Sequence, residues 1–429
     1  MPLPSSASTS RRVFLRNAGY GTAAVALASR FAPNVRAATS TYPTSTDTTA
    51  EITQMSAVKL AGLIRAKKVS AVEAVQAYLR RIDTVNPKLN AVVALCAERA
   101  IEEARAADAS LAQGAIKGPL HGVPFTAKDS LETAGVVSTA GTLGRKTYVP
   151  GADATVIARV RAAGAILLGK TNTPEFTLGG GGRGTYNLVY GQTFNPYNTA
   201  HSPAGSSGGA GAIVAAGGSA FDIGSDFGGS IRGPAHVNGI SGIKPTTGRV
   251  PRTGHLPGYG GPFDSYQELG PLARRVEDLI LINSLLVGPD WEDPVAAPIP
   301  LGEVAAVELS TLRVAYYTDN KVSKPTPETV AAVEAVAAAL KSAAKSVTED
   351  FHNGDAEGGE IRSAYVGADG GAFFQRLLDL HHTKQASPGF ARRITGKAVS
   401  ADEFTLLAEK QDAVRSRMLS WFDNYDVIV

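Results

Sequence analysis

The chain has 429 residues, of which 44% are hydrophobic and 19% charged, an ordinary globular composition for a chain that can bury a large core. Its formal net charge of +3 is small for this length, so a nucleic-acid partner is not indicated. The single cysteine, Cys96, excludes an internal disulfide, and seven scattered histidines show no metal-site spacing. One catalytic domain with a helical N-terminal portion and two domains are equally compatible with the length.

The first 37 residues have the pattern of an export signal. Residues 10–16, Ser-Arg-Arg-Val-Phe-Leu-Arg, resemble the twin-arginine signal, and residues 18–28 are mildly apolar but too short and glycine-rich to span a bilayer. We expect cleavage after Ala37, with the twin-arginine export machinery as a partner, no stable membrane anchor, and a periplasmic or secreted mature protein. A disordered basic tail is the alternative. Residues 38–50 form a polar linker with little apolar surface.

The next part of the chain predicts a helical front. Residues 56–67 and 70–84 have helical periodicity, and the second segment opens with the capping box Ser70-x-x-Glu73. It is expected to stop before Asn86-Pro87, ahead of a strand at 89–95 and an amphipathic helix at 97–113.

Helices and strands then alternate, as in an α/β fold. A strand at 123–127 delivers Lys128 at its end, where residues of α/β sheets commonly reach ligands. The remaining expected helices are 153–163, 210–216, 326–342, 361–381 and 401–423. The remaining expected strands are 165–168, 220–223, 312–317, one near Val347 and one beginning at Val427.

Residues 204–234 are richer in glycine and serine than ordinary packing explains. Two Gly-Ser clusters, 205–209 and 224–230, lie on either side of the short apolar helix and strand. Dense glycine brings backbone close to a ligand, and a hydroxyl beside free N–H groups suits acyl transfer through an oxyanion. From composition alone, two Gly/Ser-rich loops without chemistry are an equal alternative.

The chain resembles the amidase signature family from about Ala57 to its C-terminus. Four stretches stand in the family's order: Leu120 to Asp129, 169–176, the Gly-Ser-Ser-Gly-Gly and Gly-Gly-Ser-Ile-Arg cores within 205–232, and 242–246. The resemblance implies an α/β fold with a mixed, twisted central sheet flanked by helices on both faces, formed by residues 51–429. It implies a small-molecule amide substrate and no cofactor or metal.

The resemblance also implies a triad of two serines and a lysine. Ser230 is the nucleophile, Lys128 the base, and Ser206, preceded by a cis peptide bond, relays the proton. An exposed lysine titrates near 10.4, so a base working near pH 7 must be neutralised at a cost of roughly 4 kcal/mol, supplied by burial and cationic neighbours. The apolar residues before Lys128 are compatible with burial.

Further residues support the nucleophile in this family pattern. The backbone N–H groups of Phe227, Gly228 and Gly229, with that of Ser230, are expected to form the oxyanion hole, because the glycines lack side chains that would keep these groups apart. The remaining supporting residues are Ser207, Asp226 and Arg232. For Asp226 and Arg232, a purely structural salt bridge is equally compatible with the sequence.

The identity of the amide is not encoded in a motif. We expect the pocket to include the loops at 133–149 and 179–190 and helices after Thr326, with Phe227, Tyr186 and Tyr190 suggesting an apolar acyl side. Aryl, aliphatic, fatty acyl and peptide C-terminal amides stay open, esters should also be cleaved, and a homodimer is possible.

Two other functions stay open. One is the glutaminase subunit of a tRNA-dependent amidotransferase, which works in the cytosol beside a partner, so the export signal argues against it. The other is a catalytically weak or dead binding protein. In the family, a strand like 426–429 continues into further helices, so we expect a C-terminus that is truncated and lacks part of the cover over the core.

Four other motif matches are weak. The match at 164–171 to a phosphate-binding loop has the interior of an apolar strand, and the glycine pattern at 179–184 lacks an acidic partner downstream. The Gly-x-Ser-x-Gly match at 205–209 has no strand before it. The Ser-x-x-Lys match at 241–244, typical of penicillin-binding proteins, lacks a later Lys-Thr-Gly.

Overall fold

The computed structural model describes residues 51–179 and 184–429, so the expected export signal and linker lie outside the described residues. Within those two ranges, none of the helices combines the length and the apolar character that crossing a bilayer requires.

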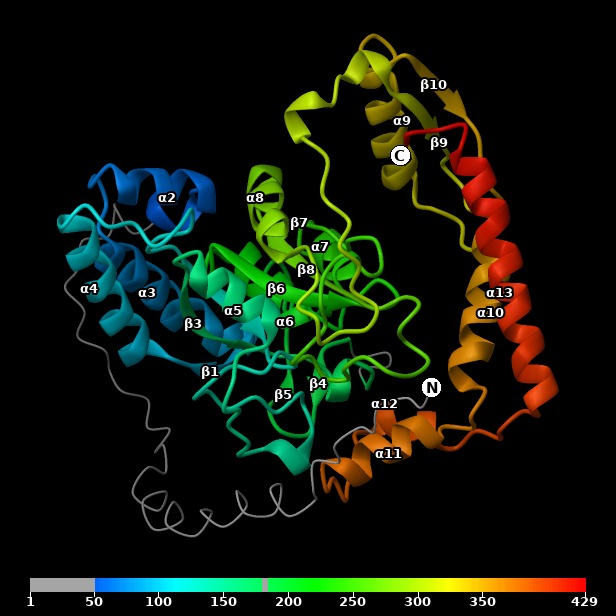
Figure 1. Ribbon diagram of the computed structural model, residues 1–429, viewed down its shortest axis with the longest axis horizontal. Coiled ribbons are helices and arrows are strands. Elements are labelled where there is room, and N and C mark those ends of the chain that lie inside the picture. Colours follow the sequence, from blue (N-terminus) through cyan, green and yellow to red (C-terminus); the bar gives the residue numbers. More distant parts are fainter. Residues whose placement is uncertain (1–50, 180–183) are drawn as a thin grey trace, which may run out of the picture. The chain divides into compact units, whose positions relative to one another are not determined.

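A six-stranded mixed sheet forms the centre of the fold (Figure 1). The neighbours β3, β2 and β6 run parallel, whereas β1 is antiparallel to β3, β8 to β6, and β7 to β8. In spatial order the strands are β1 (Val92–Leu95), β3 (Ile166–Thr171), β2 (Pro124–Lys128), β6 (Phe221–Asp226), β8 (Glu268–Ala273) and β7 (Ser241–Gly242). The mixed α/β sheet confirms the expected fold class.

Helices flank this sheet and bury its central strands, which are covered along their whole length. The first two thirds of the chain supply α2 (Ala57–Arg65), α3 (Ala71–Leu89), α4 (Ala97–Ala112), α5 (Thr155–Ala162), α6 (Gly208–Ala215), α7 (Arg232–Val237) and α8 (Val276–Leu286). Helices α3 and α6 pack on each other and on β2 and β3, while α8 packs on α5 and β8. A small antiparallel pair, β4 (Tyr186–Asn187) and β5 (Gly191–Gln192), lies outside the sheet.

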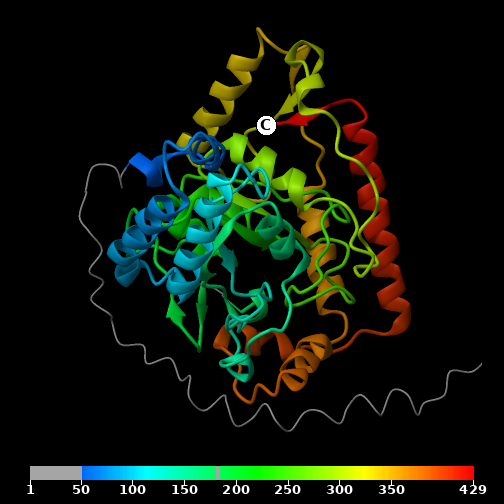
Figure 2. The ribbon, with the colours of Figure 1, turned by 60° about the vertical axis from the view of Figure 1, so that its left-hand side comes forward.

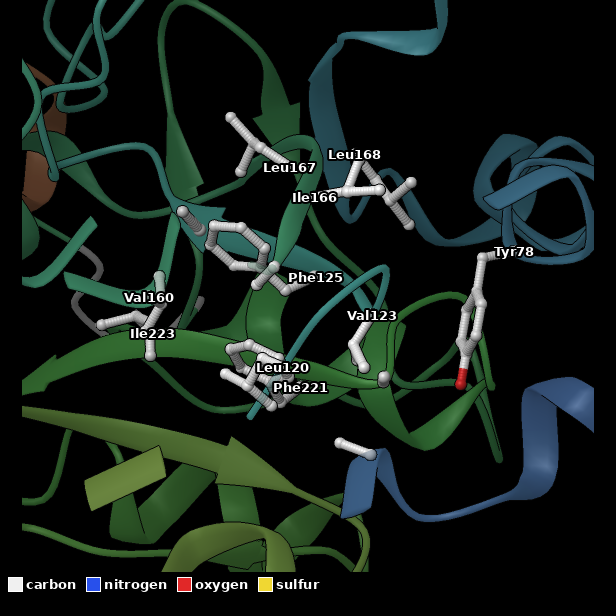
Figure 3. Close-up of a cluster of buried hydrophobic side chains, with 14 of the residues drawn as sticks. Tyr78, Leu120, Val123, Phe125, Val160, Ile166, Leu167, Leu168, Phe221 and Ile223 are labelled. Atoms are coloured by element: carbon white, nitrogen blue, oxygen red, sulfur yellow. The ribbon is translucent and has the colours of Figure 1, made fainter. Parts of the chain in front are cut away.

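The hydrophobic core fills the space between the sheet and these helices (Figure 3). Phe125 of β2 and Phe221 of β6 stack at its centre with ring centroids 5.2 Å apart. Val160 of α5 and Leu168 of β3 belong to the same buried cluster. The strands that carry the polar residues described below are therefore held by apolar packing along their length.

The last third of the chain forms a second group of elements. A three-stranded parallel sheet, in the order β10, β9, β11, is followed in space by helices α10 and α13, which lie side by side in both views (Figures 1 and 2). The elements are β9 (Arg313–Tyr316), α9 (Pro327–Leu340), β10 (Ser346–Glu349), α10 (Asp355–Gly367), α11 (Ala372–Leu380), α12 (Pro388–Ala391), α13 (Ala401–Phe422) and β11 (Val427–Ile428).

Helix α3 corrects the expected stop before Asn86-Pro87, because it runs through Pro87 to Leu89. Proline removes one helical hydrogen bond. Here the longer helix buries Leu89, and the Asn86 side chain accepts from the N–H groups of Ala91 and Val92 at 2.8 Å. The burial of Leu89 and the hydrogen bonds to Asn86 thus outweigh the tendency of Asn86-Pro87 to end the helix.

The single helix expected at 361–381 is divided into α10 and α11. Gly370 and Gly371 between them have φ of +67° and +92°, a conformation that side chains disfavour. The chain also comes too close for a side chain here, since a Cβ on Gly371 would lie 2.3 Å from the carbonyl oxygen of Arg393. These two glycines therefore form the turn that ends α10 and begins α11.

The core location of Leu168 leads to a stability prediction. Leu168→Ala removes a fully buried side chain (0% exposed) and should lower the free energy of unfolding by about 2–5 kcal/mol. The matched variant Leu419→Ala, at a position 71% exposed on α13, should change it by less than about 0.5 kcal/mol. Urea unfolding followed by circular dichroism measures both, and equal losses would contradict the position of the core.

Candidate active site

A cavity of about 850 Å³ opens beside the start of α6 and the end of β6. One wall contains three serines, Ser206, Ser225 and Ser230, together with Phe227 and Gly228. The opposite wall comes from α10, α11 and the segment 392–396. Elements after Thr326 therefore line the cavity, as expected.

The expected contribution of the loop 133–149 is wrong, since no described residue of this loop lines the cavity. The loop is instead tied into the interior: Thr139 N–H donates to Asp129 and the Thr142 hydroxyl donates to Glu175. Tyr186 and Tyr190 also lie outside the lining, so of the three aromatic residues only Phe227 borders the cavity. Hydrogen bonds to the buried carboxylates of Asp129 and Glu175 hold the loop in the interior. The sequence of the loop itself does not reveal these partners.

Lys128 lies at the end of β2 and is completely buried (0% exposed). Its Nζ lies 2.6 Å from Ser206 Oγ and 2.9 Å from both Ser207 Oγ and Ser225 Oγ. Burial lowers the pKa of Lys128 to about 7, and the carboxyl of Asp226 opposes this only in part. The amine therefore has three hydroxyl partners and a substantial neutral population near pH 7.

Ser206 connects this buried amine to the cavity. The Gly205–Ser206 peptide bond is cis, as the resemblance implied, and Ser206 lines the cavity, whereas Lys128 does not. Ser207, the residue before α6, donates its N–H to the carbonyl oxygen of Ser230 at 3.1 Å. The two serine segments are thus held together by the backbone.

Asp226 organises the loop that carries Ser230. Its carboxylate accepts from the backbone N–H groups of Gly229 (2.7 Å), Ile231 (3.0 Å) and Arg232 (3.2 Å), and pairs twice with the Arg232 guanidinium at 2.9 and 3.0 Å. Burial alone would raise the pKa of the Asp226 carboxyl, but the hydrogen bonds from Arg232, Ile231 and Gly229 hold it well below its usual range. The carboxylate stays charged and fixes the turn.

This turn decides which N–H groups can face an oxyanion. Because the Gly229 N–H already donates to Asp226, the candidates among the four expected donors are the N–H groups of Phe227, Gly228 and Ser230. Gly229 has φ of +111°, so glycine is needed there to shape the turn.

Two further polar residues lie beside Lys128 and were not singled out from the sequence. Ser225 supplies its third hydroxyl partner. Asp222 is fully buried in β6, where it accepts from Thr126 (2.6 Å) and Thr171 (3.0 Å), and burial raises its pKa to about 7. The one polar residue of the expected strand 220–223 is this aspartate, and that is the signal that could have identified it.

The weak motif match at 164–171 corresponds to buried strand β3 rather than to a phosphate-binding loop. Lys170 of this match donates to the hydroxyl of Thr133 at 2.7 Å inside the protein. Across residues 51–179 and 184–429, no three His, Cys, Asp or Glu side chains gather in the way metal ligands do.

Comparison with known proteins identifies the family. The family model described as Amidase matches residues 73–429. The chain belongs to the amidase signature family. That assignment confirms the resemblance found in the Gly/Ser-rich stretch and around Lys128.

Two relatives show how the similarity of this amidase signature protein is distributed. A glutamyl-tRNA(Gln) amidotransferase subunit from Nitratidesulfovibrio vulgaris (strain DP4) is 45% identical over 240 residues, which are 56% of this chain and 47% of that protein. The indoleacetamide hydrolase of Bradyrhizobium diazoefficiens is 43% identical over 250 residues, covering 58% of this chain and 47% of that protein. The chain thus matches about half the length of these relatives.

Solved structures share the fold over most of the chain. A fatty acid amide hydrolase superposes with a TM-score of 0.80 at 27% identity, covering 88% of this chain and 67% of that one. A 6-aminohexanoate cyclic dimer hydrolase in complex with substrate superposes with a TM-score of 0.75 at 28% identity, covering 88% and 79%.

The Asp226 network predicts a large stability effect. Asp226→Asn removes the charge that Arg232 and three N–H groups share, so the free energy of unfolding at pH 7 should fall by about 2 kcal/mol or more through the lost charge-assisted hydrogen bonds. The control Asp319→Asn breaks an exposed pair with Lys321, which solvent screens, and should leave the free energy of unfolding nearly unchanged. Urea unfolding distinguishes the two, and a loss below about 1 kcal/mol for Asp226→Asn would refute the role of this carboxylate.

Proposed function

We propose that this amidase signature protein hydrolyses carboxylic amides through an acyl-enzyme on Ser230, with Lys128 as base and Ser206 as proton relay. One observation carries the proposal: the buried Lys128 amine does not line the cavity, but its partner Ser206 lines it together with Ser230. A proton from Ser230 therefore has a route to the base through Ser206.

The reaction follows from this arrangement. The Ser230 hydroxyl gives its proton to Ser206 while Ser206 gives its own to neutral Lys128, and the Ser230 oxygen forms a bond to the carbonyl carbon. The negative charge that develops on the carbonyl oxygen is met by the N–H groups of Phe227, Gly228 and Ser230. When the carbon–nitrogen bond breaks, the relay returns the proton to the leaving amine. Water then cleaves the ester by the same relay and regenerates Ser230.

The depressed pKa of Lys128 predicts the pH dependence. Only the neutral amine accepts a proton, and its fraction grows as pH rises through the pKa of about 7. For an uncharged amide, kcat/KM should rise about tenfold per pH unit below about pH 6 and level off above about pH 8. As a control, the variant Lys146→Met, which replaces an exposed lysine, should show the same rise in kcat/KM with pH. A profile that is flat, or that rises only near the pKa of an exposed lysine, would contradict a buried lysine base.

Covalent labelling tests the nucleophile and the relay together. A fluorophosphonate should modify Ser230 alone, and Lys128→Ala or Ser206→Ala should slow the labelling by about 100-fold or more. The control Ser363→Ala removes another serine of the cavity, whose hydroxyl donates to Gly359 instead, and should label normally. Intact mass and peptide mapping give the readout. A folded protein that does not label would refute the proposal and favour a binding protein.

A second candidate, the glutaminase subunit of a tRNA-dependent amidotransferase, is favoured by the 45% identity to a subunit of the glutamyl-tRNA(Gln) enzyme. The twin-arginine signal that we propose at residues 1–37 speaks against a cytosolic partner. Hydrolysis of glutamine in strong preference to simpler amides would favour this candidate.

A further inference from the structure

The cavity is positively charged on the wall that faces the serines. Its described lining includes the guanidinium groups of Arg362, Arg392 and Arg393, and no aspartate or glutamate. The cavity thus has cationic side chains with no carboxylate of its own among the described residues to balance them.

Arg362 of α10 lies against the loop that carries Ser230. A Cβ built on Gly228 would lie 3.0 Å from Arg362 Nη1, so the guanidinium lies against this glycine. The guanidinium carbon of Arg362 is 5.8 Å from the centre of the Phe227 ring. Among the described residues it has no hydrogen-bond or ion-pair partner, so its donors are free to bind a ligand.

Arg393 adds a second, more strongly oriented cation. Its Nε donates to the carbonyl oxygen of Leu178 at 2.9 Å, and its guanidinium carbon lies 5.5 Å from the centre of the Phe374 ring. These contacts leave the terminal nitrogens available, and Arg392 precedes it on the same wall.

Guanidinium groups bind carboxylates through paired, charge-assisted hydrogen bonds, and such bonds are stronger when the site has no competing acid. We propose that the substrate is an amide carrying a carboxylate a few bonds from the scissile carbonyl, with Arg362 as the principal anion-binding residue. This inference rests on the proposed amide hydrolysis at Ser230. It also disfavours a substrate with an ammonium beside the carboxylate, because the described lining has no acid to pair with that ammonium.

A set of amides with and without a carboxylate measures how much the negative charge of the substrate contributes. The anionic series is the monoamides of malonic, succinic, glutaric and adipic acids. The neutral partner of glutaramate is 5-methylhexanamide, in which a branched methyl pair replaces the carboxylate, and glutamine adds an ammonium to glutaramate. The best monoamide should exceed its neutral partner in kcat/KM by roughly 10- to 100-fold, and glutaramate should exceed glutamine.

Variants assign the preference to Arg362. Arg362→Met should lower kcat/KM for the best monoamide by roughly 10- to 100-fold, mainly through KM, and change that of the neutral amide less than about threefold. Arg376→Met, an exposed arginine of α11 outside the lining, is the matched control and should change neither. Equal losses for charged and neutral amides would mean that Arg362 acts on the oxyanion instead, which overturns the inference.

Labelling separates this inference from the proposed function. Glutarate and its homologues should slow fluorophosphonate labelling of Ser230 in the unmodified protein but not in Arg362→Met, whose labelling without a carboxylate confirms its fold. If Ser230 labels but no carboxylate slows it and no monoamide is preferred, anion recognition is refuted while the nucleophile stands. If Ser230 does not label, the proposed function itself fails.

Discussion

A lysine amine withdrawn from water is the constraint on which the site depends. Three hydroxyl groups surround Lys128 Nζ, and hydroxyls can accept from an ammonium or donate to a neutral amine. A charged carboxylate in the same place would stabilise the ammonium and abolish the base. The nearby Asp226 pulls in that direction, but its charge is shared with Arg232 and three backbone N–H groups. The Asp226–Arg232 pair therefore shapes the loop that carries Ser230 and also weakens the effect of the Asp226 charge on the Lys128 amine.

The sheet supplies the rigidity that this chemistry needs. Lys128 ends β2, Ser225 and Asp226 end the neighbouring strand β6, and the serine pair precedes α6, which packs on both strands. Stacked Phe125 and Phe221 fix the register of the two strands behind the polar groups (Figure 3). Short distances between hydroxyl and amine are thus a consequence of apolar packing a few residues away.

The resemblance to the amidase signature family implies the parts of the site that lie on one continuous stretch or at a strand end, whereas composition alone leaves their role open. In the structure Lys128 contacts Ser206, Asp226 pairs with Arg232, and the cis peptide bond before Ser206 is present. Strand β8 is not predicted because Gly270-Pro271 is typical of a turn, yet a Cβ on Gly270 would lie 2.2 Å from the carbonyl oxygen of Ile243, so close packing selects the glycine. Arg362 could not be found either, since nothing local distinguishes it from other arginines on amphipathic helices. Its position depends on how α10 folds back across the cavity.

The two walls of the cavity come from segments that are more than a hundred residues apart in the chain. The proton relay and nucleophile occupy residues 204–230, whereas the opposite wall, with its arginines, comes from residues 362–396. Selectivity can accordingly evolve on one segment while the chemistry is inherited unchanged on the other. A mutant library confined to positions such as Ser363, Val366 and Arg392 would sample new acyl groups without touching the hydroxyls around the lysine.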